Sequence, residues 1–125
     1  MPLAFGNLGA PQVVVVAASA GGLRALQTLL AGLSADFPAA IVIVQHRSAT
    51  KTSLLEHILA RRSRLPVKTA QEGEAVQPGI VYVARPGYHL VFVGDGRFGY
   101  RDGKRIRGVL SSANPLFDSA ARVFI

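Results

Sequence analysis

The sequence lacks several features that would indicate particular classes of protein. It contains no cysteine, which excludes disulfide bonds and thiolate metal sites. Its uninterrupted apolar runs are far shorter than a membrane span, and its first six residues carry no basic region of the kind that begins a secretory signal. We therefore expect a soluble, cytoplasmic protein with no segment inserted in a membrane.

The composition is that of one globular domain. Of the 125 residues, 50% are hydrophobic, 13 are Gly and 7 are Pro, which is enough apolar content for a core. The net charge is +7, and two basic groups stand out at 61–64 and 101–107. Neither group has interleaved aromatics, so the favoured interpretation of both is solvated surface. A surface that binds an acidic protein is the second interpretation. No nucleic-acid partner is expected.

The order of apolar segments predicts an α/β fold. A leader rich in Gly, Pro and Ala is expected over 1–11, and a domain over 12–125. Buried β-branched runs and helical spacing alternate in a β-α-β-α-β rhythm, which favours a doubly wound, mostly parallel sheet with helices on both faces. The predicted strands and helices of this part are strands at 12–17, 40–44 and 66–70 and helices at 20–33 and 52–62.

The rhythm changes after residue 70. Further strands are expected at 80–84, 90–93 and about 97–100, with a tight turn at Gly94-Asp95-Gly96. These segments are interpreted as an antiparallel excursion appended to the parallel sheet. A last helix is expected from Ser111 to Arg122, and the chain then stops on an apolar run that normally leads into another strand. The C-terminal part of the fold is therefore expected to be missing.

The junction of the first strand and first helix is the strongest chemical signal. Ser19 precedes Ala20, Gly21 and Gly22, and such a strand-to-helix turn lies at the carboxyl edge of the sheet, where α/β proteins bind ligands. Glycines allow close approach of a substrate, and N–H groups of the first helical turn suit an oxyanion. Ser19 is thus a candidate nucleophile. An N-capping serine and a phosphate-binding turn remain open as alternatives.

His46 is the second signal, because it directly follows the second buried strand. If the first two strands are neighbours, Ser19 and His46 emerge side by side, and an imidazole there could take the serine proton. A purely structural histidine remains the alternative. His57 is expected to face solvent on a helix. His89, in the loop after Pro86-Gly87, is a candidate for the rim of the site, with a role in the turn as the alternative.

Several motifs in a fixed order carry a resemblance to a known family. They are Ala17-Ala18-Ser19-Ala20-Gly21-Gly22, Ile43-Val44-Gln45-His46, Glu72-Gly73-Glu74, Pro78-Gly79-Ile80-Val81-Tyr82-Val83-Ala84, Pro86-Gly87-Tyr88-His89-Leu90 and Leu116-Phe117-Asp118-Ser119-Ala120-Ala121. Over about 12–124 the sequence resembles the catalytic domain of CheB-type chemotaxis receptor methylesterases. The resemblance implies hydrolysis of glutamyl methyl esters on methyl-accepting chemotaxis receptors, glutamine deamidation in many members, and no metal or cofactor. It assigns Ser19 as nucleophile and His46 as base.

The sequence also departs from the family pattern. Ala20 stands where Thr is frequent, and Leu110–Asn114 replaces an Arg-Pro-Ser-Val-Asp segment, so substrate contacts differ. The family's Gly-Met-Gly-x-Asp-Gly motif, which supplies the triad aspartate and part of the oxyanion hole, is absent, as is a receiver domain. None of Asp36, Asp95, Asp102 or Asp118 has that context. We therefore expect this truncated chain to be nearly inactive and its exposed sheet edge to favour self-association.

Two other function classes remain. One is a non-catalytic module that binds an anion or nucleotide at the Gly21-Gly22 turn, although that turn lacks the spacing of a dinucleotide fingerprint or P-loop. The other is a serine hydrolase for a different ester, which the altered 110–114 segment would suit. Receptor peptide esters and small esters as substrates would separate these readings.

Overall fold

The structure is a computed structural model, and it describes residues 12–18, 22–45, 55–86, 88–102, 116 and 118–121. The order of elements agrees with the sequence prediction, with shorter helices. The elements are β1 (Val13–Ala18), α1 (Leu23–Ala31), β2 (Ala40–Gln45), α2 (Leu55–Ala60), β3 (Val67–Thr69), β4 (Val81–Val83), β5 (Tyr88–Val93) and β6 (Arg97–Asp102). The predicted leader, 1–11, lies outside the described residues.

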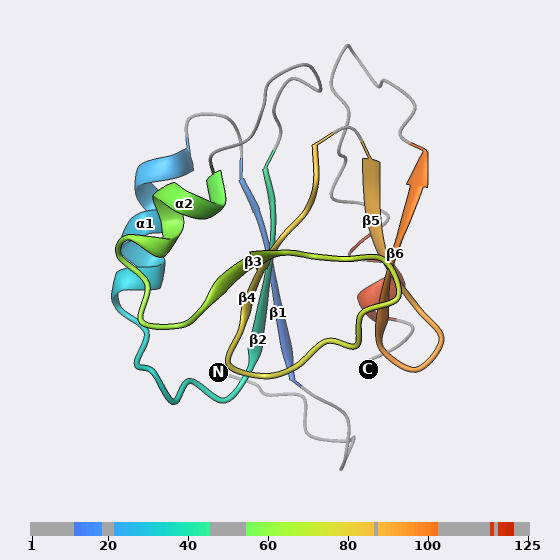
Figure 1. Ribbon diagram of the computed structural model, residues 1–125, viewed down its shortest axis with the longest axis horizontal. Helices are drawn as coiled ribbons and strands as arrows, with labels where there is room; N and C mark the ends of the chain where they lie inside the picture. The colour runs from blue at the N-terminus through green and yellow to red at the C-terminus, as the bar shows by residue number, and fades with distance from the viewer. Residues whose placement is uncertain are drawn as a thin grey trace.

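The main sheet has four strands in the order β1-β2-β4-β3, and every pair in it is parallel. β2 lies between β1 and β4, and residues 40–44 are all buried, as expected for a strand covered on both faces. The helices α1 and α2 connect successive parallel strands (Figure 1). The predicted parallel α/β sheet is confirmed.

The assignment of 80–84 to the antiparallel excursion is wrong. This segment forms β4, which pairs in parallel with β2 on one side and with β3 on the other. All three residues of β4 are buried, so the strand belongs to the centre of the sheet. The continuous apolar run indicated a central parallel strand. It was grouped with the next two strands because they follow it closely along the chain.

The two faces of the sheet are covered differently. The helices α1 and α2 lie together on one face, where Leu30 and Leu59 pack with Ile43 and Val83 in one core cluster. The hairpin of β5 and β6 lies across the other face (Figure 1). Because strand side chains alternate between faces, Val42 and Tyr82 face this second cluster while their neighbours face the helices.

The hairpin confirms the predicted antiparallel appendage. β5 and β6 pair over six positions, and the turn between them uses Gly94 and Gly96, whose φ angles of 57° and 102° suit glycine. Phe98 packs its ring 5.2 Å from that of Phe92 and 4.8 Å from that of Tyr82, measured between centroids. These aromatic contacts attach the hairpin to the face of the parallel sheet.

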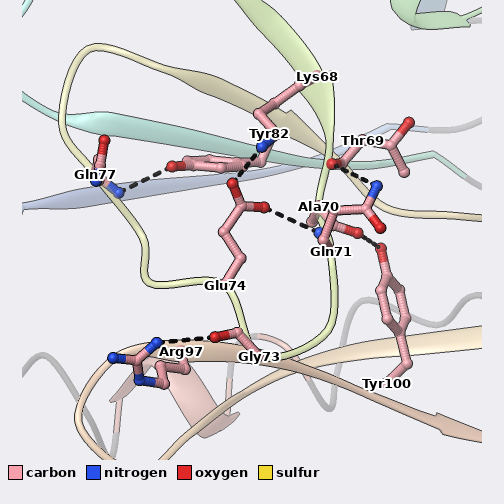
Figure 2. Close-up of polar contacts among 10 residues, drawn as sticks. All are labelled: Lys68, Thr69, Ala70, Gln71, Gly73, Glu74, Gln77, Tyr82, Arg97 and Tyr100. Carbon is pink, nitrogen blue, oxygen red and sulfur yellow. Dashed lines mark hydrogen bonds and ion pairs between the residues drawn. The ribbon is translucent and has the colours of Figure 1, made fainter.

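The long connection between β3 and β4 is tied to both the sheet and the hairpin (Figure 2). Glu74 forms an ion pair with Lys68 and accepts a hydrogen bond from the backbone N–H of Gln71 at 3.1 Å. The backbone of the same segment bonds to β6, and Arg97 donates to the carbonyl of Gly73 at 2.9 Å. The connection therefore holds the hairpin in a fixed position relative to β3 and β4.

The last helix is described at residues 116 and 118–121, within the predicted range, and the remainder of that prediction falls outside the described residues. Its buried Ser119 hydroxyl accepts a hydrogen bond from the Phe92 backbone N–H at 2.8 Å. None of the described helices is long and apolar enough to cross a bilayer.

Within the described part of the chain, β1 pairs with β2 alone, and Val14 in β1 is 36% exposed. Self-association through this edge stays a prediction.

Candidate active site

The carboxyl ends of β1 and β2 meet at one point of the sheet edge. The register pairs Ala18 with Gln45, and these are the last residues of their strands. Ser19 directly follows one member of this pair and His46 the other. Ser19, Ala20, Gly21 and His46 themselves lie outside the described residues, so their roles stay predictions. The structure shows that the two strands they follow are parallel neighbours and end at the same level of the sheet edge.

Gly22 is described and caps the N-terminus of α1. Its φ and ψ are −89° and 7°, and it supplies no side-chain cap to the helix, whose first turn contains no acidic residue. A Cβ on Gly22 would lie 3.0 Å from the Cβ of Ala18, which is tighter than ordinary contacts. The absence of a side chain therefore lets the chain turn from strand to helix at close range. It also places the N-cap position three residues after Ser19, which disfavours the reading of Ser19 as that cap.

His89 lies in a strand rather than in a loop, which corrects the sequence prediction. It is the second residue of β5 and pairs with Arg101 of β6. Its side chain is only 9% exposed. The strand begins two residues earlier than expected because β6 continues to Asp102 and supplies partners up to Tyr88. β5, of which His89 is the second residue, follows the carboxyl end of β4 along the chain, and the role of His89 at the rim stays a prediction.

Arg85 is a residue of this edge that sequence reasoning missed. It follows β4 and is exposed, and its guanidinium carbon lies 4.9 Å from the ring centroid of Tyr88 and 4.7 Å from that of Tyr100. The backbone N–H of Arg85 also donates to the Tyr100 hydroxyl at 3.1 Å. Tyr100 is fifteen residues away in the sequence, so no local pattern indicated the contact. A basic residue directly after a buried apolar strand was the available signal, and it pointed to the ligand edge only once that strand was placed in the parallel sheet.

Two of the aspartates set aside on sequence grounds lie away from the carboxyl edge. Asp36 precedes β2 and accepts a hydrogen bond from the Ser34 hydroxyl at 2.6 Å, which lowers the pKa of its carboxyl below the ordinary value. Asp95 lies in the turn between β5 and β6 and pairs with Arg97 at 3.6 Å. Among the described residues, no group of three His, Cys, Asp or Glu side chains could hold a metal ion.

Taken together, these features define an open α/β domain in which β1 ends at the carboxyl edge of a parallel sheet and Gly22 caps the helix that follows, and this edge is the usual location of sites in this class. A family model described as CheB methylesterase matches residues 14–125. The chain belongs to the CheB methylesterase family, whose members act as chemotaxis hydrolases.

Individual relatives agree with this assignment. The chain is 43% identical over 113 residues to protein-glutamate methylesterase/protein-glutamine glutaminase 2 of Anaeromyxobacter dehalogenans, covering 90% of this chain and 33% of the relative. It is 36% identical over 113 residues to a putative protein of the same description from Leptospira interrogans, covering 90% and 58%. The crystal structure of the Thermotoga maritima CheB methylesterase catalytic domain superimposes with a TM-score of 0.84 at 35% identity, covering 92% of this chain and 62% of that chain. The chain thus spans one third to about 60% of these relatives.

Proposed function

We propose that this chain carries the nucleophile and base of a cytoplasmic protein-glutamate methylesterase that acts on chemoreceptors. The substrate is a glutamyl methyl ester, and glutamine side-chain amides are hydrolysed by the same route. The observation that carries the proposal is the pairing of Ala18 with Gln45 at the carboxyl edge. Adjacent strands lie about 4.8 Å apart, so the strand ends that Ser19 and His46 follow in the sequence are neighbours, and we propose that the serine hydroxyl and the imidazole form a hydrogen bond.

The reaction is acyl transfer. The Ser19 Oγ attacks the ester carbonyl while His46 takes the hydroxyl proton, and backbone N–H groups of Ala20, Gly21 and Gly22 stabilise the oxyanion. The tetrahedral intermediate collapses, His46 returns the proton to the departing methoxide, and methanol leaves. Water then gives a proton to His46 and attacks the acyl carbon, and His46 returns that proton to the Ser19 Oγ as free glutamate leaves. The first turn of α1 supports this role, because its N-cap is a glycine and no acidic side chain repels an oxyanion there.

Efficient turnover needs a carboxylate that orients the histidine. The family motif Gly-Met-Gly-x-Asp-Gly requires a methionine between two glycines. The single methionine of these 125 residues is Met1, so the motif does not occur in them. In serine hydrolases, loss of the orienting carboxylate lowers turnover by about 10⁴. We therefore expect the 125-residue chain alone to hydrolyse esters about 10⁴ times more slowly than a chain that includes the motif.

The test is methanol release from a methyl-esterified receptor helix, measured with the 125-residue chain and with any longer chain of which it forms part. Ser19→Ala is expected to abolish release above background, while Ser34→Ala, an exposed serine before β2, leaves it unchanged. Unaltered hydrolysis by the Ser19→Ala protein would overturn the proposal. Hydrolysis of small esters but not receptor esters would identify a different esterase. Phosphate or nucleotide binding indifferent to Ser19 and His46, without hydrolysis, would identify a binding module.

A further inference from the structure

Arg85 lies at the edge of the sheet where β1 and β2 end, and Ser19 and His46 follow these strand ends in the sequence. The parallel pairing of β2 and β4 includes Ile43 with Val83, and the backbone N–H of Ala84 still donates to the Ile43 carbonyl at 3.0 Å. Arg85 is the next residue, so its backbone is about level with the end of β2. β4 is the second strand from β1, which sets Arg85 about 10 Å across the edge from the end of β1.

Two tyrosine rings hold the guanidinium of Arg85. Its carbon lies 4.9 Å from the ring centroid of Tyr88 and 4.7 Å from that of Tyr100, within the range of a cation–π contact. The two rings meet edge to face at 6.1 Å between centroids. Arginine loses much rotamer freedom when it binds a ligand, and these contacts restrict it beforehand.

Tyr100 is itself fixed in place. Its hydroxyl donates to the Ala70 carbonyl at 2.7 Å, as Figure 2 shows, and accepts the backbone N–H of Arg85 at 3.1 Å. Burial raises the pKa of this hydroxyl, which keeps the proton that the bond to Ala70 requires. The ring that supports the guanidinium is thus anchored to the end of β3 and to the backbone of Arg85 itself.

The charge of Arg85 is available to a ligand. The side chain is exposed, and the ion pairs of Lys68 with Glu74 and of Arg97 with Asp95 do not involve it. Among the described residues, the guanidinium makes cation–π contacts with these two rings. A guanidinium carries five N–H donors, and a pair of them can bind a carboxylate through two parallel hydrogen bonds.

We propose that Arg85 is a specificity-determining residue that binds a free carboxylate of the substrate, and this inference rests on the proposed function. The ligand is a glutamate side chain that accompanies the esterified glutamate on an acidic helix. The backbone of Arg85 is about 10 Å from the end of β1, which corresponds to about two helical turns, so we expect the bound carboxylate about seven residues from the ester.

The experiment uses the longest active form of the protein and two helical peptides that differ at two positions. Both carry a glutamyl methyl ester, with Glu seven residues to either side in one and Gln in the other. Arg85→Gln is expected to raise KM about 10-fold for the Glu peptide, to leave kcat within twofold, and to change neither constant for the Gln peptide. Arg61→Gln, which removes one exposed charge just after α2, is the matched control and is expected to change neither peptide's KM. Equal KM for Arg85→Gln and wild type on the Glu peptide would overturn the inference.

A second pair of variants tests the support given by the ring. Tyr88→Phe keeps the aromatic face and is expected to retain the wild-type KM, whereas Tyr88→Leu is expected to raise it about threefold for the Glu peptide only. Equal KM for the two variants would contradict the role of Tyr88. A binding measurement distinguishes failure of this inference from failure of the proposed function. Binding of the Glu peptide to the Ser19→Ala protein, measured by fluorescence anisotropy, does not require turnover. An unchanged Kd when Arg85→Gln is added to that protein would overturn the inference independently.

Discussion

Ala18 and Gln45 are partners in the parallel register of β1 and β2, and each is the final residue of its strand. This relationship brings two separate segments of the sequence to one location, since 27 positions separate the two residues along the chain. The residues that follow them are a serine and a histidine. A shift of register by one residue would move one strand end about 3.3 Å along the other and weaken the proposed hydrogen bond.

The first prediction concerns the cooperation of Ser19 and His46. Residues that act as one catalytic unit are strongly non-additive, because removing either one removes the common pathway. His46→Gln is therefore expected to lower kcat for receptor methyl esters by at least about 10³, and Ser19→Ala/His46→Gln to be no slower than Ser19→Ala alone. His57→Gln is the control, since His57 is exposed on α2. Multiplicative losses in the double variant would show that the two residues act separately.

The second prediction concerns the tight turn before α1. Gly22→Ala places a Cβ 3.0 Å from that of Ala18, and we expect a loss of about 1 kcal/mol in the free energy of unfolding from the overpacking. Gly32→Ala is the control, because the nearest atoms to its Cβ would lie at 3.6 Å and 3.7 Å. Gly32→Ala is expected to raise the free energy of unfolding by about 0.5 kcal/mol, because alanine lowers the conformational entropy of the unfolded chain.

The double variant Ala18→Gly/Gly22→Ala checks the cause of this effect. Removing the Ala18 methyl group relieves the contact, so the two changes should be non-additive in urea denaturation. Additive losses would mean that the contact between the two Cβ atoms is not the source of the destabilisation.

Residue patterns were sufficient for the elements and for the parallel sheet, because they are local. The buried β-branched run at 40–44 predicts β2 to within one residue, and the helical spacing at 23, 26 and 30 predicts α1, whose bounds Leu23–Ala31 are shorter than the expected 20–33. The place of β4 between β2 and β3 was missed, since strand order depends on packing between distant segments and no local pattern records it.

The candidate site shows the same division. The turn before α1 follows from a strand, two glycines and a helix in succession. The arrangement of Arg85 between Tyr88 and Tyr100 requires the hairpin to fold back over the sheet, and His89 was placed in a loop because its partner in β6 was not evident. Contacts across the hairpin were thus the part that sequence alone left out.

The third prediction is a decline of stability at high pH caused by buried tyrosines. Burial raises the pKa of Tyr82 and of Tyr100 above 10.0 in the folded protein. The unfolded chain then releases these protons at lower pH than the folded protein, so stability is complete below pH 10 and falls as pH rises through the folded pKa values. Urea midpoints at pH 8 and pH 10.5 should differ less in Tyr100→Phe than in wild type. An identical decline in both proteins would exclude Tyr100 as a source.

The last prediction concerns the buried Ser119, which joins the last described helix to β5. Its hydroxyl accepts the Phe92 backbone N–H at 2.8 Å and donates to the Leu116 carbonyl at 3.0 Å, and the residue is 1% exposed. Ser119→Ala leaves that N–H buried without this acceptor, so we expect a loss of about 1–3 kcal/mol in the free energy of unfolding.

Hydrogen exchange of the Phe92 amide should quicken in the Ser119→Ala protein, because its acceptor is gone. Ser34→Ala, which removes an exposed hydroxyl bonded to Asp36, is expected to change stability by less than about 0.5 kcal/mol. Equal stability of the two variants would show that the helix at 118–121 contributes little to holding the hairpin, and that the aromatic contacts of Phe98 with Phe92 and Tyr82 suffice.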